Sequence, residues 1–435
     1  MTEHSTHNFT DTIRDRLSIV DVVSRYVPIT KRGASYWCCC PFHSEKTPSM
    51  CVNEKRGQFH CFGCGEHGDI FSFVMKFLHC DFITATKELA NLAGVEIPRQ
   101  KSVSDRSLCV RKSKYFDLYE RATREYERLL NSRSGEVALA YLHDRGFTSE
   151  MIKKFRIGYA PNANTLSDLF IGESSSALYG SGLVRQGGVG PYDFFRDRIM
   201  FPITDERGRV IAFSARAIFG DGPKYVNSAD TEFFHKRQTL YGLHTAKNSI
   251  YLNNRIIVVE GQIDCIKMQC AGLQEAVAPL GSAFTTDHLR TISKMNRNII
   301  FLFDGDEAGK KAAFNACKLC LPFVRYDSDI RVAFLPFQED PDSLLESQGL
   351  DGMMPILDNS VPLFEFLWDK LTEMWNTKEI MGRANFLKAM RAVCVAIEDE
   401  ELRKDITLEY TARTLKRFYS KTDRIALARR LGDVC

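Results

Sequence analysis

The chain has 435 residues, of which 44% are hydrophobic and 26% are charged, and its formal net charge is only +3. These values are typical of a soluble protein with several domains, and the longest apolar runs, such as Ile256–Val259, are far too short to cross a bilayer. The first ten residues are polar and contain no apolar secretion signal, so we expect a cytoplasmic protein. The 14 cysteines are then expected to be metal ligands or buried thiols rather than disulfides.

The first hundred residues are predicted to contain short helices around a cysteine-rich stretch. Helices are expected near residues 9–20, 71–78 and 86–92. Ser18 and Asp21 have the spacing of a helix-capping box, so a second short helix is expected to begin there. Residues 98–113 are polar and basic with little hydrophobic periodicity, and we interpret them as a linker.

The middle of the chain mixes a helical stretch with predicted strands. Residues 115–147 have a helical pattern, whereas residues 172–191 are rich in Gly and Ser and are expected to form a loop. Two apolar runs, residues 199–203 and 210–213, flank a turn and predict a β-hairpin.

From residue 255 onward, predicted strands and helices alternate. Strands are expected at residues 256–259, 275–279, 298–303 and 329–335, and helices at residues 263–271, 286–295 and 307–320. This alternation predicts a mostly parallel sheet with helices on both faces, and the chain after residue 360 is expected to be helical. The predicted fold class is therefore multidomain, combining α/β and α+β parts.

Two short pairs of potential metal ligands lie close together in the sequence. They are Cys40-Pro41-Phe42-His43 and Cys61-Phe62-Gly63-Cys64. Each pair lets a tight turn present two ligands, and two pairs complete a tetrahedron around zinc with no open position. We therefore predict one structural zinc ion bound by Cys40, His43, Cys61 and Cys64. Cys38, Cys39, His60 and His67 are neighbouring alternatives that do not form matched pairs.

Two other groups of residues near these motifs have competing explanations. Cys317 and Cys320 repeat the C-x-x-C spacing inside a predicted helix, where ordinary packing is favoured. Around the zinc motif, aromatic residues alternate with cations: Tyr36, Trp37, Phe59 and Phe62 with Lys46, Lys55 and Arg56. This mixture suits stacking on unpaired bases, although about half of the aromatic residues are expected to form the small core instead.

Acidic residues follow three of the predicted strands. They are Glu260, then Asp304 and Asp306, then Asp340 and Asp342. The carboxyl ends of parallel strands face one crevice, so these five acids are expected to converge there. Their mutual repulsion requires a cation, and oxygen ligands favour Mg²⁺ or Mn²⁺. Helix capping or turn formation is the alternative role for any one of them, Asp306 and Asp342 above all.

These motifs together resemble the bacterial replicative primases. CPFHSEKTPSM and FHCFGCGEHGD are similar to the zinc ribbon of that family, and FRDRIMFPITDERGRVIAFSAR, PKYVNS and LYGL to its basic polymerase subdomain. VVEGQID, FLFDGDEAGKKAA and EDPDSLL are similar to the Toprim domain that primases share with topoisomerases. The resemblance implies a zinc ribbon over residues 1–100, a linker over 101–114, a basic subdomain over 115–253, a Toprim subdomain over 254–345 and a helical segment over 346–435.

The resemblance also implies roles for individual residues. Glu260, Asp304 and Asp306 would bind two catalytic Mg²⁺ or Mn²⁺ ions, with Asp340 and Asp342 close by and Asp264 supporting the site from the following helix. Arg196, Arg198, Arg216, Lys224 and Lys236 would bind phosphates of the template or of the nucleotide. Ordinary surface charge is the alternative for these cations, particularly for Arg196 and Lys236.

The implied activity is the synthesis of short RNA primers on single-stranded DNA from nucleoside triphosphates during chromosome replication. The expected partners are the template, the triphosphates, the nascent primer and the replicative helicase, and a monomer without membrane contact is expected. Relatives continue with a helicase-docking domain that we expect to be absent or truncated here, and they often have an aromatic residue and Met where Gln262-Ile263 stand. Two rival functions are a DNA-cleaving Toprim topoisomerase or nuclease and a non-enzymatic zinc-containing DNA-binding adaptor.

Overall fold

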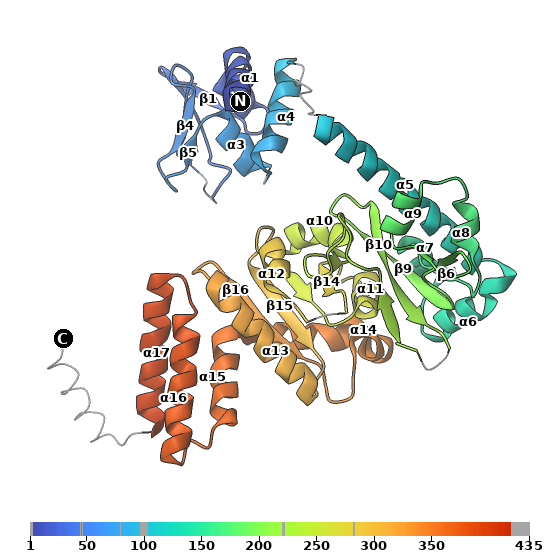
Figure 1. Ribbon diagram of the computed structural model, residues 1–435. Helices are drawn as coiled ribbons and strands as arrows, with labels where there is room; N and C mark the ends of the chain where they lie inside the picture. The colour runs from blue at the N-terminus through green and yellow to red at the C-terminus, as the bar shows by residue number, and fades with distance from the viewer. Residues whose placement is uncertain are drawn as a thin grey trace. The chain divides into compact units, whose positions relative to one another are not determined.

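The computed structural model describes residues 3–43, 45, 47–78, 80–95, 103–219, 222–281 and 283–418. The chain forms two compact units, and the boundary between them along the chain lies between Arg106 and Ser107 (Figure 1). Among the described helices, none combines the length and the apolar composition that a bilayer span requires.

The first unit is a five-stranded antiparallel sheet accompanied by helices. Its strands pair in chain order: β1 (Thr30–Arg32), β2 (Ser35–Cys38), β3 (Met50–Asn53), β4 (Gln58–Cys61) and β5 (His67–Gly68). Its helices are α1 (Glu3–Arg16), α2 (Ile19–Ser24), α3 (Ile70–Phe77) and α4 (Phe82–Ala93). The predicted cap is confirmed, because the Ser18 hydroxyl accepts a hydrogen bond from the Asp21 amide at 3.1 Å. Alternate strand residues such as Met50, Val52 and Phe59 are buried against the helices.

The second unit begins with helices and a four-stranded antiparallel sheet. The helices are α5 (Val103–Leu130), α6 (Glu136–Asp144), α7 (Ser149–Lys154), α8 (Thr165–Leu169) and α9 (Ser175–Gly180). The sheet has the order β11 (Tyr225–Asn227), β10 (Val210–Ala217), β9 (Arg198–Thr204) and β6 (Gly158–Ala160), and β7 (Val184–Gln186) pairs with β8 (Pro191–Asp193). Strands β9 and β10 are antiparallel neighbours, which confirms the predicted hairpin.

Two predictions of local structure in this region were wrong. The stretch interpreted as a linker contains the boundary between the two compact units, and helix α5 begins within it at Val103. The helix expected over 115–147 is interrupted after Leu130, where Asn, Ser and Gly residues are poor helix formers. The expected loop over 172–191 contains α9 and the β7–β8 hairpin, because residues such as Leu178 and Leu183 are buried in the core.

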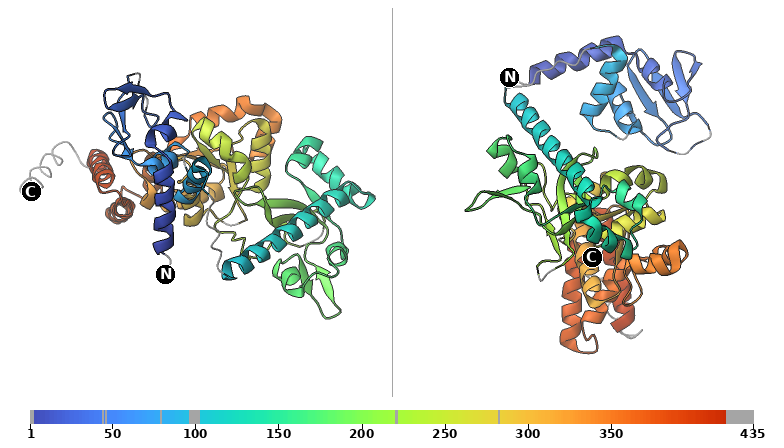
Figure 2. Two further views of the ribbon diagram at one scale, coloured as in Figure 1. Left: turned by 90° about the horizontal axis from the view of Figure 1, so that it is seen from above. Right: turned by 90° about the vertical axis from the view of Figure 1, so that its right-hand side faces the viewer.

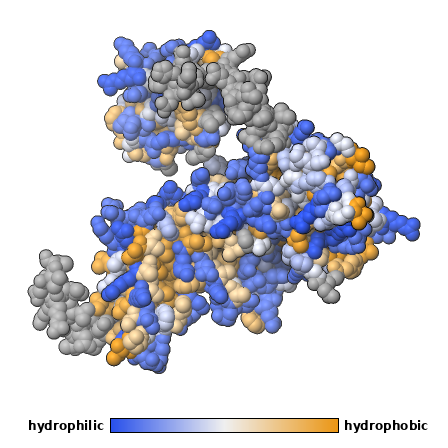
Figure 3. Space-filling view, in the orientation of Figure 1, coloured by the Kyte–Doolittle hydropathy of each residue, from blue (hydrophilic) through white to orange (hydrophobic). Residues whose placement is uncertain are grey.

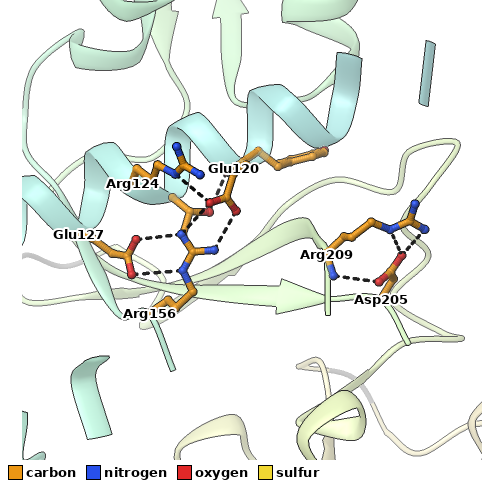
Figure 4. Close-up of polar contacts among 8 residues, drawn as sticks. Glu120, Arg124, Glu127, Arg156, Asp205 and Arg209 are labelled. Atoms are coloured by element: carbon orange, nitrogen blue, oxygen red, sulfur yellow. Dashed lines mark hydrogen bonds and ion pairs between the residues drawn. The ribbon is translucent and has the colours of Figure 1, made fainter. Parts of the chain in front are cut away.

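An ion-pair network joins α5 to the segment between α7 and β6. Arg156 donates to both oxygens of Glu120 and both oxygens of Glu127, at 2.8 to 3.2 Å (Figure 4). Arg156 is one of the few non-glycine residues with positive φ, at 55°. Asp205 and Arg209 form a similar pair across the β9–β10 turn. These bidentate contacts fix the helices and turns against the antiparallel sheet.

The following part is a six-stranded, mostly parallel sheet, as predicted. Its order is β12 (Leu240–Tyr241), β14 (Ala276–Pro279), β13 (Ile256–Val258), β15 (Asn298–Phe303), β16 (Asp329–Phe334) and β17 (Val361–Pro362), and only the two edge strands are antiparallel. Its helices are α10 (Leu243–Asn253), α11 (Gln262–Ala271), α12 (Thr286–Ile292), α13 (Glu307–Cys320) and α14 (Pro341–Asp358). Because the central strands are parallel, their carboxyl ends lie along one edge of the sheet.

Both faces of this sheet are buried, which explains why its strands are continuously apolar. In β15, Phe301 and Phe303 belong to the core cluster that also contains residues of α13, whereas Ile300 and Leu302 belong to the cluster with α11 and α14. Alternate side chains therefore enter different cores.

Three helices follow the sheet, as predicted. They are α15 (Leu363–Met374), α16 (Ile380–Val395) and α17 (Glu400–Phe418); α15 contacts β16 and the edge strand β17, α16 packs on α15, and α17 packs on α16 (Figures 1 and 2). Trp368, Phe386 and Tyr410 fill their shared core. Figure 3 shows hydrophobic surface over these helices, where Met374 and Ile380 are exposed.

Candidate metal centres and nucleic-acid interface

The four predicted zinc ligands come together in the first unit. Cys40 follows β2 and Cys61 ends β4, and the ligand atoms of Cys40, His43, Cys61 and Cys64 all lie within 4.8 Å of one another. Cys40 Sγ is 3.8 Å from Cys64 Sγ, and Cys61 Sγ is 3.9 Å from His43 Nδ1. Within the described ranges no other group of three or more His, Cys, Asp or Glu ligands is so closely spaced. Three thiols and one imidazole fit a closed, tetrahedral zinc site.

Glu45 orients the histidine of this site. Its Oε2 atom lies 3.2 Å from His43 Nε2, and its Oε1 atom accepts a hydrogen bond from the Cys40 amide at 2.6 Å. With Nε2 bound to a carboxylate, Nδ1 is the nitrogen left for the metal. Gly63 permits this packing, because a Cβ at that position would lie 2.7 Å from His43 Nε2. Our sequence analysis missed Glu45, since an acid two residues after a histidine has no distinctive spacing.

Hydrogen bonds favour the thiolate form of Cys61. Burial raises the pKa of this thiol, but Ser49 and the backbone amides of Cys64 and Gly63 contact its sulfur and lower the pKa to about 7. Ser49 Oγ is 3.1 Å away, and the Gly63 and Cys64 amides donate at 3.3 and 3.4 Å. The thiolate is the form that binds zinc, so the local backbone is arranged for metal binding.

An aromatic surface lies beside the zinc site. Phe62 is 69% exposed and stacks on Trp37 with a ring-centroid separation of 5.9 Å, and His60 meets Phe62 edge-on at 4.6 Å. Phe59, by contrast, is buried in the core. The expected division of the aromatic residues between core and surface is therefore visible here. Lys46 lies outside the described residues.

Three of the predicted acidic residues meet at the carboxyl ends of β13 and β15. Glu260 Oε1 accepts a hydrogen bond from the Asp304 amide at 3.2 Å. Gly305 makes the next turn possible, because a Cβ there would lie 2.3 Å from the Leu335 carbonyl oxygen. Asp306 caps α13 by accepting a hydrogen bond from the Gly309 amide at 2.7 Å. Asp306 thus caps α13, and its charge also acts on Asp304.

The charges in this acidic site repel one another. Burial, followed by the charges of Glu260, Asp306 and Asp340, raises the pKa of Asp304 to about 6. Fully ionised acids at this spacing need a counter-charge, which a divalent cation bound by oxygen ligands supplies.

Asp264 and Asp340 extend the same site. Asp264 lies in the first turn of α11 and accepts a hydrogen bond from the Gly261 amide at 3.0 Å, and Asp340 caps α14. Burial and the charges of Asp340 and Asp304 raise the pKa of Asp264 to about 7. Asp264 is therefore close enough to the predicted metal ligands to influence them.

Asp342 differs from the other acids because it forms an ion pair with a lysine side chain. Its Oδ1 atom lies 2.7 Å from the Lys267 ammonium, and both side chains are largely buried. Lys267 is a second residue that the sequence analysis missed, because a single Lys on an apparently apolar helix carries no signal.

The five predicted basic residues do not form one surface. None of them has a carboxylate partner among the described residues. Arg198 lies opposite Ala217, and Arg216 lies opposite Ile199, in the β9–β10 register. Opposed residues share a face of the sheet, so Arg198 and Arg216 point to opposite faces. Lys224 is exposed and Arg196 contacts Asn164, while Lys236 is half-buried.

Arg216 is the most buried of these cations, with 4% of its surface exposed. Its guanidinium donates to the Tyr225 hydroxyl at 2.7 Å and lies 5.5 and 5.4 Å from the ring centroids of Tyr141 and Tyr225. Its Nε atom has no hydrogen-bond partner within the described part of the chain. The raised pKa of Tyr225 is due first to burial, and the charges of Arg216, Asp264 and Arg145 also act on it. Tyr225, which contacts the Arg216 guanidinium, is therefore near enough to Asp264 for the charge of that acid to act on it.

Comparisons with known proteins show the family of the chain. Models of the CHC2 zinc finger, the N-terminal domain of the DNA primase catalytic core and the Toprim domain match residues 5–105, 125–247 and 254–334. The DNA primase of Escherichia coli strain K12 is 34% identical over 400 residues, which cover 91% of this chain and 69% of that protein. The chain belongs to the DNA primase family. The predicted resemblance is thus confirmed.

Other primases show how much of the family the chain covers. The DNA primase of Pseudomonas putida is 38% identical over 405 residues, but this chain spans only 61% of its length. A solved DnaG primase catalytic domain bound to single-stranded DNA has a TM-score of 0.64 and 33% identity, and the match covers 70% of this chain and 99% of that one. The polymerase core of the primase family is therefore present in the second unit.

Proposed function

We propose that the chain is a DNA-templated RNA polymerase that synthesises short primers on single-stranded DNA from nucleoside triphosphates. The observation that carries this proposal is the presence of two unbalanced charged groups in the second unit, which Tyr225 connects, because its hydroxyl contacts Arg216 and the charge of Asp264 acts on it. The acids around Asp304 repel one another, and the buried Arg216 has no acidic partner among the described residues. A triphosphate with divalent cations satisfies both groups, because it brings anionic oxygens to the arginine and positive charge to the acids.

In the proposed nucleotidyl transfer, the acids bind the metal ions and Arg216 binds phosphate. Glu260, Asp304 and Asp306 would hold two Mg²⁺ or Mn²⁺ ions, which supply charge neutralisation and acidify the attacking hydroxyl. Arg216, held by the Tyr225 hydroxyl, would contact a phosphate oxygen of the nucleotide. The reaction needs mainly positioning and charge neutralisation, and base pairing with the template selects the nucleotide, so few base-reading side chains are needed.

The template is proposed to contact both units. In the first unit, we assign base stacking to Phe62 and Trp37, since an exposed ring stacked on a half-buried one suits unpaired bases. In the second unit, Arg196, Arg198, Lys224 and Lys236 supply cations for the phosphates. The relative solved with single-stranded DNA supports this class of ligand. We place the activity in the cytoplasm at the replication fork, and the monomeric state and the contact with a helicase stay predictions.

The decisive experiment measures incorporation of labelled ribonucleotides on single-stranded DNA with Mg²⁺, separated by length. The wild-type chain should make short, template-dependent RNA, and Asp304→Ala should make none while it retains DNA binding and a normal melting temperature. Phe62→Ala should weaken DNA binding without changing the melting temperature, because the Phe62 side chain is 69% exposed. Absence of RNA from the wild-type chain with either Mg²⁺ or Mn²⁺ would contradict the proposal, and cut template would favour a nuclease.

A further inference from the structure

Lys267 and Asp342 form a buried ion pair at the margin of the acidic site. Their charged atoms are 2.7 Å apart, and the exposed fractions of the two side chains are 8% and 14%. Lys267 lies on α11 and Asp342 in the first turn of α14, two residues after Asp340. An ion pair this buried is retained only when both charges are well compensated, because each has lost most of its contact with water.

The ammonium of Lys267 is held by a third segment of the chain. It donates to the Arg145 carbonyl oxygen at 2.6 Å and lies 4.9 Å from the centroid of the Phe147 ring. Between these residues, Gly146 has a φ of 69°, and a Cβ there would lie 2.9 Å from Lys267 Nζ. The turn at residues 145–147 therefore closes around the ammonium with a carbonyl, an aromatic face and a glycine.

This arrangement changes the charge of the acidic site. Asp342 lies near enough to Asp264 for its charge to contribute to the raised pKa of Asp264, and the Lys267 ammonium, 2.7 Å from Asp342, offsets that charge. With Lys267 in contact, the pair as a whole is neutral. The other acids of the site differ from Asp342, because Glu260, Asp304 and Asp340 form no ion pair among the described residues and Asp306 has only an electrostatic interaction with Lys310.

We propose that Lys267 is a positioning residue of the acidic site, which neutralises Asp342 and ties the start of α14 to the turn at residues 145–147. Asp342 thus serves as the counter-ion of Lys267, and divalent cations are bound by the other carboxylates. This inference rests on the proposed function and deepens it, because it assigns different roles to two of the predicted acids.

The test compares Mn²⁺ binding by the zinc-loaded full chain and its variants, measured by electron paramagnetic resonance. Asp342→Asn leaves the Lys267 charge uncompensated beside the site, so it should weaken Mn²⁺ binding about fivefold or more. The double variant Lys267→Met with Asp342→Asn removes both charges, so it should bind the same number of ions as wild type, with an affinity within about twofold. If Asp342 were a metal ligand, the double variant would not recover the Mn²⁺ affinity and the number of bound ions of the wild type.

A second buried pair provides the matched control. Arg255 Nε and Glu275 Oε1 are 2.7 Å apart, and both residues immediately precede strands β13 and β14, at the ends opposite Glu260. Arg255→Met with Glu275→Gln should lower the melting temperature without changing Mn²⁺ affinity. This control separates a general loss of stability from an effect on the metal site.

Two results would overturn the inference. If the double variant loses an ion or stays more than about fivefold weaker than wild type, Asp342 is itself a ligand. If Asp342→Asn binds Mn²⁺ as wild type does, the ion pair does not act on the site. Should Asp342→Asn fail to fold, the double variant still decides, because it leaves no unpaired charge. These readings need no RNA synthesis, so they are distinct from a failure of the proposed polymerase activity.

Discussion

Replacing Glu45 with Gln should weaken zinc binding without removing any zinc ligand. The carboxylate accepts hydrogen bonds from the Cys40 and Ser49 amides and lies 3.2 Å from His43 Nε2. Hydrogen bonds from Ser49, then from the Cys40 amide, lower the pKa of Glu45, so the group is an anion at neutral pH. A Gln side chain preserves the size and one acceptor, but it removes the charge that holds the imidazole Nε2–H.

The expected magnitude follows from this geometry. Loss of a carboxylate that orients a metal-bound histidine weakens metal binding by about 10- to 100-fold. The zinc dissociation constant of Glu45→Gln should therefore rise by that factor, as measured by competition with a chromogenic chelator at pH 7.5. For both proteins the affinity should fall towards pH 6, because protons compete for the ligands, including Cys61 with its pKa of about 7.

A neighbouring acid supplies the control for this experiment. Glu54 lies in the exposed turn between β3 and β4, and no ion pair of its side chain is found among the described residues. Glu54→Gln makes the same chemical change and should leave the dissociation constant unaltered. A Glu45→Gln variant that binds zinc within about twofold of wild type would refute the reasoning, because the carboxylate would then contribute nothing to the orientation of His43.

The other predictions concern the second unit. Arg216→Met should raise the KM for nucleoside triphosphates at least about tenfold in the primer assay. Tyr225→Phe, which removes one hydrogen bond to Arg216, should raise this KM less. Equal KM values for Arg216→Met and wild type would exclude a phosphate contact. The pKa of Asp264 is raised from 3.8 to about 7, so the folded chain without Mg²⁺ loses stability as pH rises between these values. Thermal unfolding of Asp264→Asn should show an advantage over wild type that grows from pH 4 to pH 7 and is constant above, whereas a pH-independent difference would contradict this. Arg156→Ala should lower the free energy of unfolding by about 1–2 kcal/mol, a modest value because the ion pairs with Glu120 are partly exposed. Primer synthesis by this variant should be unchanged. An unchanged denaturant midpoint would show that the network does not stabilise the fold.

Functional residues that lie within one local structure were predictable from their spacing in the sequence. Cys40 with His43 and Cys61 with Cys64 each occupy a single tight turn, so their pairing follows from distances along the chain. Glu260 and Asp304 each follow a strand that is buried on both faces, and such strands are recognisable as continuous apolar runs. Once the strands are parallel, their carboxyl ends meet, and the acidic site follows from topology alone.

Local composition was a weaker guide wherever packing decided the outcome. The segment around Leu178 has the Gly and Ser content of a loop, but its few apolar residues are buried, and it forms a helix followed by a hairpin. The sequence of residues 103–113 has little hydrophobic periodicity, yet the long helix that ends at Leu130 begins at Val103.

Which charged groups compensate one another depends on the tertiary fold. Lys267 and Asp342 are 75 residues apart, and the carbonyl of Arg145 comes from another subdomain, so no local pattern could connect them. The same holds for the opposite faces of Arg198 and Arg216, which depend on the register between two strands. Charge acts through space and not along the chain, and therefore the roles of individual acids and cations became visible only when the fold had placed them.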